Sequence, residues 1–296
     1  LRELITPNNF IVCVAGLLLM NKYCFPERIP VLMGILNVTE DSFSDGAQFL
    51  DRELAIKHTE VMIAEGAEII DIGAESTRPG SLPVPAEIQE QRIIPILSSL
   101  IEKYPKVTFS VDTQEATVAE KAIELGASII NDISALRTDP ALAELLSTNP
   151  EVKVILMHMQ GTPRTMQINP VYQDVLVEIK DFFQERIDFC LAKGILRENI
   201  MLDPGIGFGK NLEHNLTILG NLRTFKEFGL PLVVGASRKS FIDKISPSSP
   251  AQRIGGCLAA AFVSACEEID ILRVHDVLLH RQFFEVLTAI AKAKRD

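Results

Sequence analysis

Three aspartates, Asp71, Asp112 and Asp203, each stand near the end of a short apolar run and could share one binding site. A carboxylate in such a position can accept paired hydrogen bonds from an amino-pyrimidine edge, or it can bind a metal ion or an arginine. The alternative is an internal ion pair that holds loops together. For Asp71 the two interpretations are equally good, whereas we expect Asp112 and Asp203 to contact a ligand.

Arg273 and His275 end another apolar run, in the motif RVHD. Side chains alternate along a strand, so these two would point to the same side. Beside Asn37, at the end of the first apolar run, two such cations would form a pocket for an anion. His275 alone would more often be a structural histidine, but its pairing with Arg273 favours a role in ligand binding.

The motif GASRKSF (235–241) has Ser237, Arg238, Lys239 and Ser240 where a strand gives way to a helix. The beginning of a helix suits an anion, because its free N–H groups point outward. Lys239 could also donate a hydrogen bond to a ligand carbonyl. A solvated basic loop is the alternative.

Two further motifs carry weaker signals. The glycine-rich segment LDPGIGFGK (202–210) is typical of phosphate-binding loops and of simple tight turns alike, and it is not a P-loop because neither Ser nor Thr follows Lys210. His158, in LMHMQGTP, has no second histidine at a metal-binding spacing. We expect a structural role for this histidine.

Two polar loops, residues 37–49 and 75–85, follow the first and second apolar runs. The first has Phe43 among short polar side chains that include Asp45. Loops of this kind often close over a substrate, and ordinary long connections between a strand and a helix are the alternative.

These polar residues all follow apolar runs, so the elements that position them can be inferred. Eight runs are rich in Val, Ile and Leu: 31–37, 67–73, 107–113, 127–134, 152–158, 199–205, 231–237 and 269–276. Amphipathic stretches lie between the runs, and those at 53–67 and 115–127 end in Gly-Ala, as helix C-caps do. Apolar strands that alternate with helices indicate a parallel sheet covered by helices. Eight such units predict a (β/α)8 TIM barrel in one domain, with a doubly wound open sheet as the alternative.

The composition limits the function classes. The chain has 296 residues, of which 47% are apolar, and a formal net charge of −10. This acidity argues against a partner that is a nucleic acid or a membrane surface, since both require a basic face. Five cysteines without a metal-ligand spacing indicate reduced thiols in a cytoplasmic protein.

The N-terminal segment of residues 1–30 is expected to form a β-hairpin extension of the barrel. Its apolar stretch, residues 10–20, is too short to span a bilayer, which takes about 20 residues. The stretch also lacks the charged start of a signal peptide.

The motifs together resemble the dihydropteroate synthase family. They occur in order as MGILNVTEDSFSDGA, DIGAESTRPG, SVDT, NDIS, VLMHMQGTP, LDPGIGFGK, GASRKSF and RVHD, between about residues 31 and 276. The resemblance implies a (β/α)8 barrel that forms a homodimer. It also implies the condensation of 6-hydroxymethyl-7,8-dihydropterin pyrophosphate with p-aminobenzoate, which gives 7,8-dihydropteroate and pyrophosphate. Members of the family are targets of sulfonamides.

The resemblance assigns roles to matched positions. The pterin would be held by Asp112, Asn131, Met159, Asp203, Phe208, Lys239 and Arg273. The pyrophosphate would be held by Asn37, Arg273 and His275, with Mg²⁺ at or near Asn37. p-Aminobenzoate would meet Phe43, Thr77, Arg78 and Ser240. The residues expected to act in catalysis are Asp45, Arg78, Asp112, Lys239, Arg273 and His275.

Three positions depart from the family pattern. Glu40 stands where the first loop usually has proline, Ala47 where a second glycine is common, and Ala74 where the second loop usually has Gly-Gly. Glu40 removes a restraint on φ and adds a negative charge beside a site for an anion. Glu40 therefore bears on how the first loop closes and on none of the matched ligand positions.

We expect the reaction to proceed by ionisation of the pyrophosphate followed by attack of the amine, because a dihydropterin can share positive charge with its methylene carbon. Two other functions remain open from the sequence. One is a barrel that transfers a methyl group from methyltetrahydrofolate to a corrinoid, against which the motifs SFSDG, ESTRPG and SRKS argue. The other is a non-catalytic pterin-binding paralogue whose first loop no longer closes.

Overall fold

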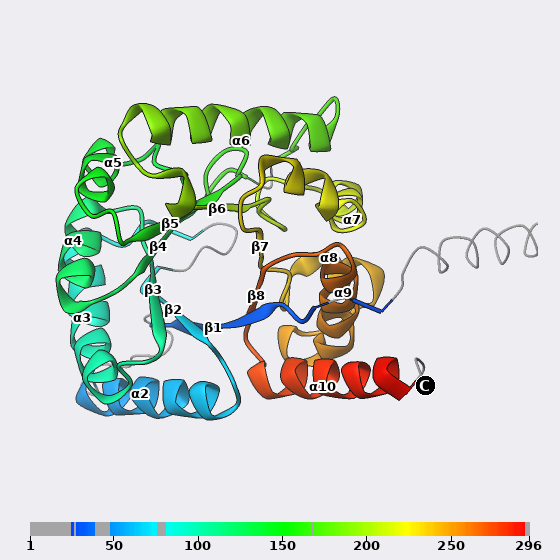
Figure 1. The fold of residues 1–296 in the computed structure, drawn as a ribbon, viewed down its shortest axis with the longest axis horizontal. Coiled ribbons are helices and arrows are strands. Elements are labelled where there is room, and N and C mark those ends of the chain that lie inside the picture. Colours follow the sequence, from blue (N-terminus) through cyan, green and yellow to red (C-terminus); the bar gives the residue numbers. More distant parts are fainter. Residues whose placement is uncertain (1–24, 27, 39–47, 76–80, 167, 294–296) are drawn as a thin grey trace, which may run out of the picture.

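The computed structural model describes residues 25–26, 28–38, 48–75, 81–166 and 168–293. One parallel sheet of eight strands forms its centre (Figure 1). The strands are β1 (Val31–Asn37), β2 (Ile69–Gly73), β3 (Thr108–Asp112), β4 (Ile129–Asp132), β5 (Lys153–Met157), β6 (Ile200–Asp203), β7 (Val233–Val234) and β8 (Ile271–Val274). Each lies within one of the eight apolar runs, so the predicted strands are confirmed.

The sheet curls into a nearly closed barrel. Its strand order is β6-β5-β4-β3-β2-β1-β8-β7, so the first and last strands of the chain are neighbours. The two ends of this order meet where Leu202, in β6, forms a parallel bridge with Leu232, just before β7. There the N–H of Leu202 donates to the carbonyl of Pro231 at 2.9 Å. This closure makes the fold barrel-like, and the open doubly wound sheet is excluded.

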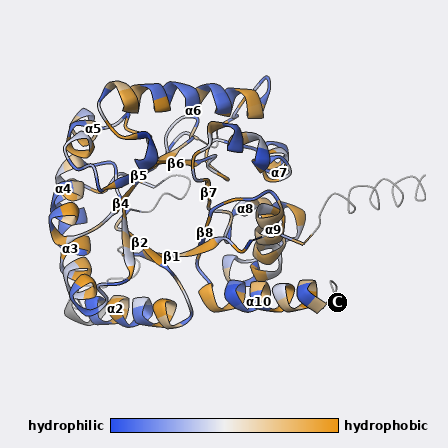
Figure 2. Ribbon diagram, viewed as in Figure 1, coloured by the Kyte–Doolittle hydropathy of each residue, from blue (hydrophilic) through white to orange (hydrophobic). Residues whose placement is uncertain are grey.

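Helices cover the outside of the sheet (Figure 1). They are α2 (Gln48–Ala64), α3 (Ala86–Lys103), α4 (Ala116–Leu125), α5 (Pro140–Ser147), α6 (Val175–Ala192), α7 (Leu212–Leu219), α8 (Ser240–Ile245), α9 (Ile254–Cys266) and α10 (Val277–Ala293), with the 3₁₀ turns η2 (Arg197–Asn199), η3 (Leu222–Phe228) and η4 (Pro250–Gln252). Gly66 and Gly126 follow α2 and α4 with positive φ, as the Gly-Ala endings predicted. Figure 2 shows hydrophilic and hydrophobic residues alternating along α2, α6 and α10, which is the pattern of helices with one face on a core.

The outward side chains of the strands pack with the helices in one large core. The inward side chains form a separate apolar layer across the barrel, made by Met33, Ile69, Ile129, Ile155, Met201, Val233 and Ile271. Asp71, Asn131, Asp203 and Arg273 each stand two residues after a member of this layer. Because side chains on one face of a strand recur every second residue, these four polar groups lie directly above the apolar layer.

The predicted N-terminal hairpin lies outside the described residues, apart from positions 25, 26 and 28–30. Three of the cysteines, Cys190, Cys257 and Cys266, are described and are free thiols. Within the described ranges, no helix has the length and apolar character needed to cross a membrane.

Candidate active site

Arg273 joins two carboxylates at the mouth of the barrel. Its Nε donates to Asp71 Oδ2 at 2.6 Å and its Nη2 donates to Asp112 Oδ2 at 2.9 Å. The arginine comes from β8 and the carboxylates from β2 and β3, so the barrel closure brings them together. Burial would lower the pKa of Arg273, but the charges of Asp71, Asp112 and Asp203 raise it above its ordinary value. The guanidinium therefore stays charged in this site.

Asp71 is fully buried and accepts two further hydrogen bonds. Ser110 Oγ donates to its Oδ1 at 2.6 Å, and Asn131 Nδ2 donates to its Oδ2 at 3.0 Å. Asp71 is thus the ion-pair partner of Arg273, which is one of the two roles left open by the sequence. It also orients the amide of Asn131, whose Oδ1 accepts no hydrogen bond from another described side chain and could accept one from a ligand.

The carboxylates of Asp112 and Asp203 are harder to ionise than free aspartates. Burial raises the pKa of Asp112 to about 7, although the charge of Arg273 acts in the opposite direction. Burial also raises the pKa of Asp203, against the hydrogen bond from the N–H of Gly205 at 2.7 Å and the charges of Lys239 and Arg273. Both groups are therefore sensitive to any added cation or hydrogen-bond donor.

Lys239 lies over the ring of Phe208, with 3.9 Å between its Nζ and the ring centroid. Burial and the charge of Arg273 lower the pKa of Lys239 to about 8, while Asp203 and Asp112 act in the opposite direction. Phe208 belongs to a small buried apolar cluster with Met159. The structure thus brings Lys239, Phe208 and Met159, three of the residues expected at a pterin, to one wall of the mouth.

The sequence suggested His275 as a second cation. Burial and the charges of Arg238 and Arg273 lower its pKa to about 3, which favours a neutral imidazole in the site as described. The N–H of His275 donates to Ser237 Oγ at 3.3 Å, and the same oxygen lies 3.0 Å from Nδ1. Because Ser237 accepts the backbone bond, its own proton is available for Nδ1. His275 would then carry its hydrogen on Nε2.

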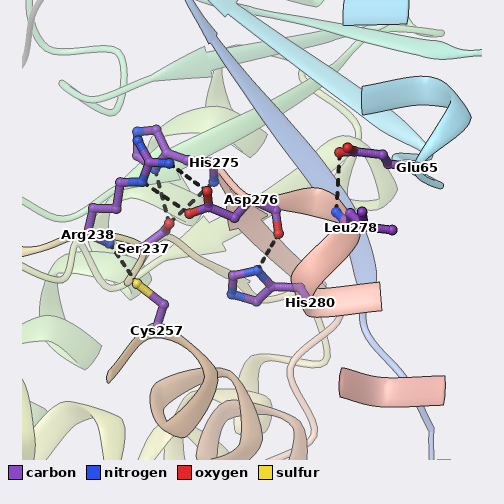
Figure 3. A network of polar contacts seen from close by, with 8 residues as sticks. All are labelled: Glu65, Ser237, Arg238, Cys257, His275, Asp276, Leu278 and His280. Atoms are coloured by element: carbon purple, nitrogen blue, oxygen red, sulfur yellow. Dashed lines mark hydrogen bonds and ion pairs between the residues drawn. The ribbon is translucent and has the colours of Figure 1, made fainter. Parts of the chain in front are cut away.

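The sequence suggested that Arg238 would contribute to an anion site. In the structure its side chain pairs with a carboxylate of the protein instead. Its guanidinium makes two bonds to Asp276, of 3.1 and 2.5 Å, and its N–H donates to Cys257 Sγ at 3.1 Å. Figure 3 shows Arg238 turned toward Asp276, with Ser237 and His275 beside the pair. These contacts fix the loop that carries Lys239 and the exposed Ser240, which begins α8.

Asn37 ends β1 with an exposed side chain. The register of β1 and β8 pairs Met33 with Arg273, so Asn37 lies on the same rim as the arginine, two residues beyond the position level with His275. Its amide oxygen is a hard ligand that suits Mg²⁺, an ion that usually keeps several waters and binds substrate phosphates. Among the described residues no group of three His, Cys, Asp or Glu side chains could hold a metal. A magnesium ion held by Asn37 would therefore take its other ligands from water and substrate.

Four expected site residues, Phe43, Asp45, Thr77 and Arg78, lie outside the described residues. The two loops predicted as lids contain them. Nothing in the described part of the chain bears on these four assignments.

Two features of the mouth were missed from the sequence. Lys210 is 1% exposed and contacts His158, for which the sequence predicted a structural role. Glu75, after β2, has its pKa raised to about 7 by burial and by the nearby Glu115. In the sequence, Lys210 stands in a glycine-rich segment and Glu75 follows an apolar run. Charged residues at such positions are usually solvated, so neither was recognised as buried.

Two of the cavities lined by described residues are large enough to be compared with the site. One of about 340 Å³ lies beside His275 and Asp276 and is also lined by His58 and Val61 of α2 and by Glu65, which follows that helix. The other, of about 540 Å³, lies away from the mouth between α7, α8 and α9 and has a mostly apolar lining. Only the first adjoins a residue of the candidate site.

Comparison with known proteins gives one consistent result. A family model described as pterin binding enzyme matches residues 33–275. The dihydropteroate synthase of Escherichia coli strain K12 is 45% identical over 267 residues, which cover 90% of this chain and 94% of that protein. The dihydropteroate synthase of Haemophilus influenzae is 41% identical over 92% of this chain and 98% of its own length.

Solved structures agree. The Yersinia pestis dihydropteroate synthase in a sulfonamide drug complex superposes with a TM-score of 0.83 at 41% identity, over 90% of this chain and 95% of that one. The Xanthomonas albilineans enzyme with 4-aminobenzoic acid superposes with a TM-score of 0.82 at 38% identity, over 88% of this chain and 93% of that one.

Proposed function

The chain belongs to the pterin-binding enzyme family and has the dihydropteroate synthase function of its close relatives, and we propose that the polar mouth of its barrel performs the reaction. The substrates are 6-hydroxymethyl-7,8-dihydropterin pyrophosphate and p-aminobenzoate, and the products are 7,8-dihydropteroate and pyrophosphate. The observation that carries the proposal is the ion-paired Arg273, bonded to Asp71 and Asp112 at the centre of the mouth.

The pterin ring is held by three hydrogen-bond acceptors from different strands and by one hydrogen-bond donor from the loop after β7. Asp112, the free Oδ1 of Asn131 and Asp203 accept from the N–H groups of the ring, and Lys239 donates to its carbonyl. Phe208 and Met159 line the pocket. Arg273 stacks on the ring with a guanidinium plane that Asp71 and Asp112 fix from one side.

The leaving pyrophosphate is held on the side where β1 and β8 meet. Arg273 supplies positive charge, and neutral His275 donates a hydrogen bond from Nε2, because its Nδ1 faces Ser237. Asn37 would hold a magnesium ion together with waters and phosphate oxygens, and that ion would add positive charge near the leaving group when bound.

The carbon–oxygen bond breaks first, and its electron pair leaves with pyrophosphate. The dihydropterin shares the resulting positive charge, which Asp112 and Asp203 favour electrostatically. The amine of p-aminobenzoate then attacks the methylene carbon and loses a proton. The described part of the site supplies orientation and charge for these steps, so no side-chain nucleophile is required.

p-Aminobenzoate binds at the outer rim. Ser240 is exposed at the beginning of α8, next to Lys239, and so could meet its carboxylate. Phe43, Thr77 and Arg78 complete this site, and Asp45 acts with them when the loops exclude water. The Xanthomonas relative, which was solved with 4-aminobenzoic acid, supports this second substrate.

The chain acts as a homodimer in this proposal. Light scattering of the purified protein at several concentrations tests this, and a monomeric mass throughout would exclude it.

The reaction is tested by incubating both substrates with Mg²⁺ and measuring pyrophosphate. We expect release that depends on p-aminobenzoate, and loss of that release in Asp203→Asn. Pterin binding without release would indicate a non-catalytic paralogue. Methyl transfer from methyltetrahydrofolate to a corrinoid would indicate the other function that the sequence left open.

A further inference from the structure

Lys210 is a buried lysine beside the pterin-binding residues that takes no part in the mechanism above. Its Nζ donates to Phe208 O at 2.9 Å and to His158 O at 3.2 Å, and it lies 3.0 Å from His158 Nδ1. Burial lowers the pKa of Lys210 to about 7, against the charge of Asp203, which favours the ammonium. An ammonium has three protons, so these bonds use all of them. An ammonium can only donate to Nδ1 of His158, which would place the hydrogen of this imidazole on Nε2.

These bonds join the loop after β6 to the end of β5. Within that loop the N–H of Gly205 donates to Asp203 Oδ1 at 2.7 Å, and the N–H of Phe208 donates to the carbonyl of Gly205 at 3.1 Å. Lys210 holds the carbonyl of Phe208. Phe208, whose ring lies beneath Lys239, is therefore fixed at both its N–H and its carbonyl.

The two loops also touch through their backbones. A Cβ on Gly205 would lie 2.0 Å from the carbonyl oxygen of His158, so a side chain at this position would push the loops apart. Gly205 has a φ of +67°. Lys210 and Asp203 also favour each other's charged forms, in opposition to the effect of burial on both.

We propose that Lys210 is a positioning residue for pterin recognition, which keeps Phe208 and Asp203 in place by tying the loop after β6 to His158. The inference rests on the pterin-binding role given above to Asp203 and Phe208. A purely structural role is the competing explanation. In that case the buried ammonium would stabilise the barrel without a preference for either substrate site.

The test variant is Lys210→Met, which retains an unbranched side chain and removes the charge and the three bonds. We expect the Kd for 6-hydroxymethylpterin, measured by calorimetry, to increase at least about tenfold. The KM for p-aminobenzoate, measured at saturating pterin substrate, should stay within about twofold of the wild-type value.

His158→Leu is the milder variant and carries the test if Lys210→Met does not fold. It removes one of the three acceptors and leaves Lys210 with the two carbonyls. Its Kd for 6-hydroxymethylpterin should increase at least about threefold, again without a change in the KM for p-aminobenzoate.

Asn199→Ala is the matched control, because Asn199 makes a buried bond at the opposite end of β6. It is 6% exposed and donates to the carbonyl of Pro150 at 2.6 Å. This variant should have a lower Tm and an unchanged affinity for 6-hydroxymethylpterin.

Unchanged pterin affinity in a folded Lys210→Met or His158→Leu would overturn the inference, as would a loss shared equally by both substrates. Calorimetry needs no turnover. A chain that bound pterin through Lys210 but released no pyrophosphate would therefore contradict the proposed reaction and leave this inference standing.

Discussion

Arg273 is the residue whose removal would leave the most charge uncompensated. In Arg273→Ala, Asp71 and Asp112 would lose their shared partner, and Asp71 is fully buried. We expect kcat/KM to fall by roughly 10²–10³, as for the loss of one preorganised donor. Stability should fall by about 3–5 kcal/mol, because breaking a buried ion pair leaves charges without a partner. Steady-state kinetics and urea denaturation measure the two effects.

Arg223→Ala is the control for this prediction. Arg223 pairs with Glu268 at 3.0 Å, but the two side chains are 58% and 42% exposed. Its removal should change kcat/KM by less than about twofold, since exposed ion pairs contribute little. A loss of activity below about threefold in Arg273→Ala would contradict its role.

Asp112 predicts a particular dependence of stability on pH. Its pKa of about 7 in the folded chain exceeds the ordinary 3.8. Between these two pH values the folded state therefore retains a proton that the unfolded state loses. Asp112 therefore favours folding below about pH 4, and this contribution is lost as the pH rises toward about 7. Asp112→Asn cannot titrate. Between about pH 4 and pH 8 the wild type should lose more than about 1.4 kcal/mol of stability relative to this variant, as measured by urea denaturation. A constant difference would exclude a raised pKa.

At the scale of residues, the sequence indicated where polar groups would be but not which would pair. Asp112, Asn131, Asp203 and Arg273 were identifiable because each ends a run that is otherwise apolar. The charge state of His275 was not, since it depends on burial and on Arg238, which comes from another loop.

At the scale of elements, the loop between β6 and α7 depends on a glycine that a side chain cannot replace. Gly205→Ala would place a Cβ 2.0 Å from the carbonyl oxygen of His158 at a φ of +67°. We expect kcat/KM to fall at least about tenfold because the loop that carries Phe208 must shift.

Gly229→Ala separates backbone strain from this steric contact. Gly229 also has a positive φ, +63°, but a Cβ there would meet nothing within 4 Å. It should cost about 1 kcal/mol of stability and leave kcat/KM within about twofold. Equal kinetic losses in both variants would show that the contact with His158 does not matter.

The elements themselves were largely predictable. All eight strands lie within apolar runs, because strands buried on both faces leave a continuous apolar pattern. Lys210 was not recognised, because a lysine in a glycine-rich loop looks solvated until the neighbouring loop is known. Its partner His158 is 52 residues away in the sequence.

At the scale of the whole molecule, the site exists because the barrel closes. Asp71 and Arg273 are 202 residues apart in sequence and meet through the register of β1 with β2 and β8. Sequence patterns gave the number of strands, but the pairs across the mouth depend on register and tilt. These arise only when all eight strands are assembled.

Among the described strands, pairing is least extensive between β6 and β7, where a single bridge joins Leu202 to Leu232. β7 has two residues, whereas β1 and β2 are aligned over five pairs. Asp203 follows Leu202 directly on one side of this junction, and Lys239 comes from the loop after β7 on the other. A pterin that contacts both Asp203 and Lys239 would link the two sides of the junction between β6 and β7.

Hydrogen–deuterium exchange should show whether pterin binding stabilises this junction. Addition of 6-hydroxymethylpterin should slow exchange in peptides that contain Leu202 and Val233 more than in peptides from β1 and β2, because ligand binding raises the free energy of local opening. Equal slowing in both regions would argue against such a link. If exchange slows mainly at this junction, the bound pterin substitutes for the strand pairing that the two-residue β7 does not provide.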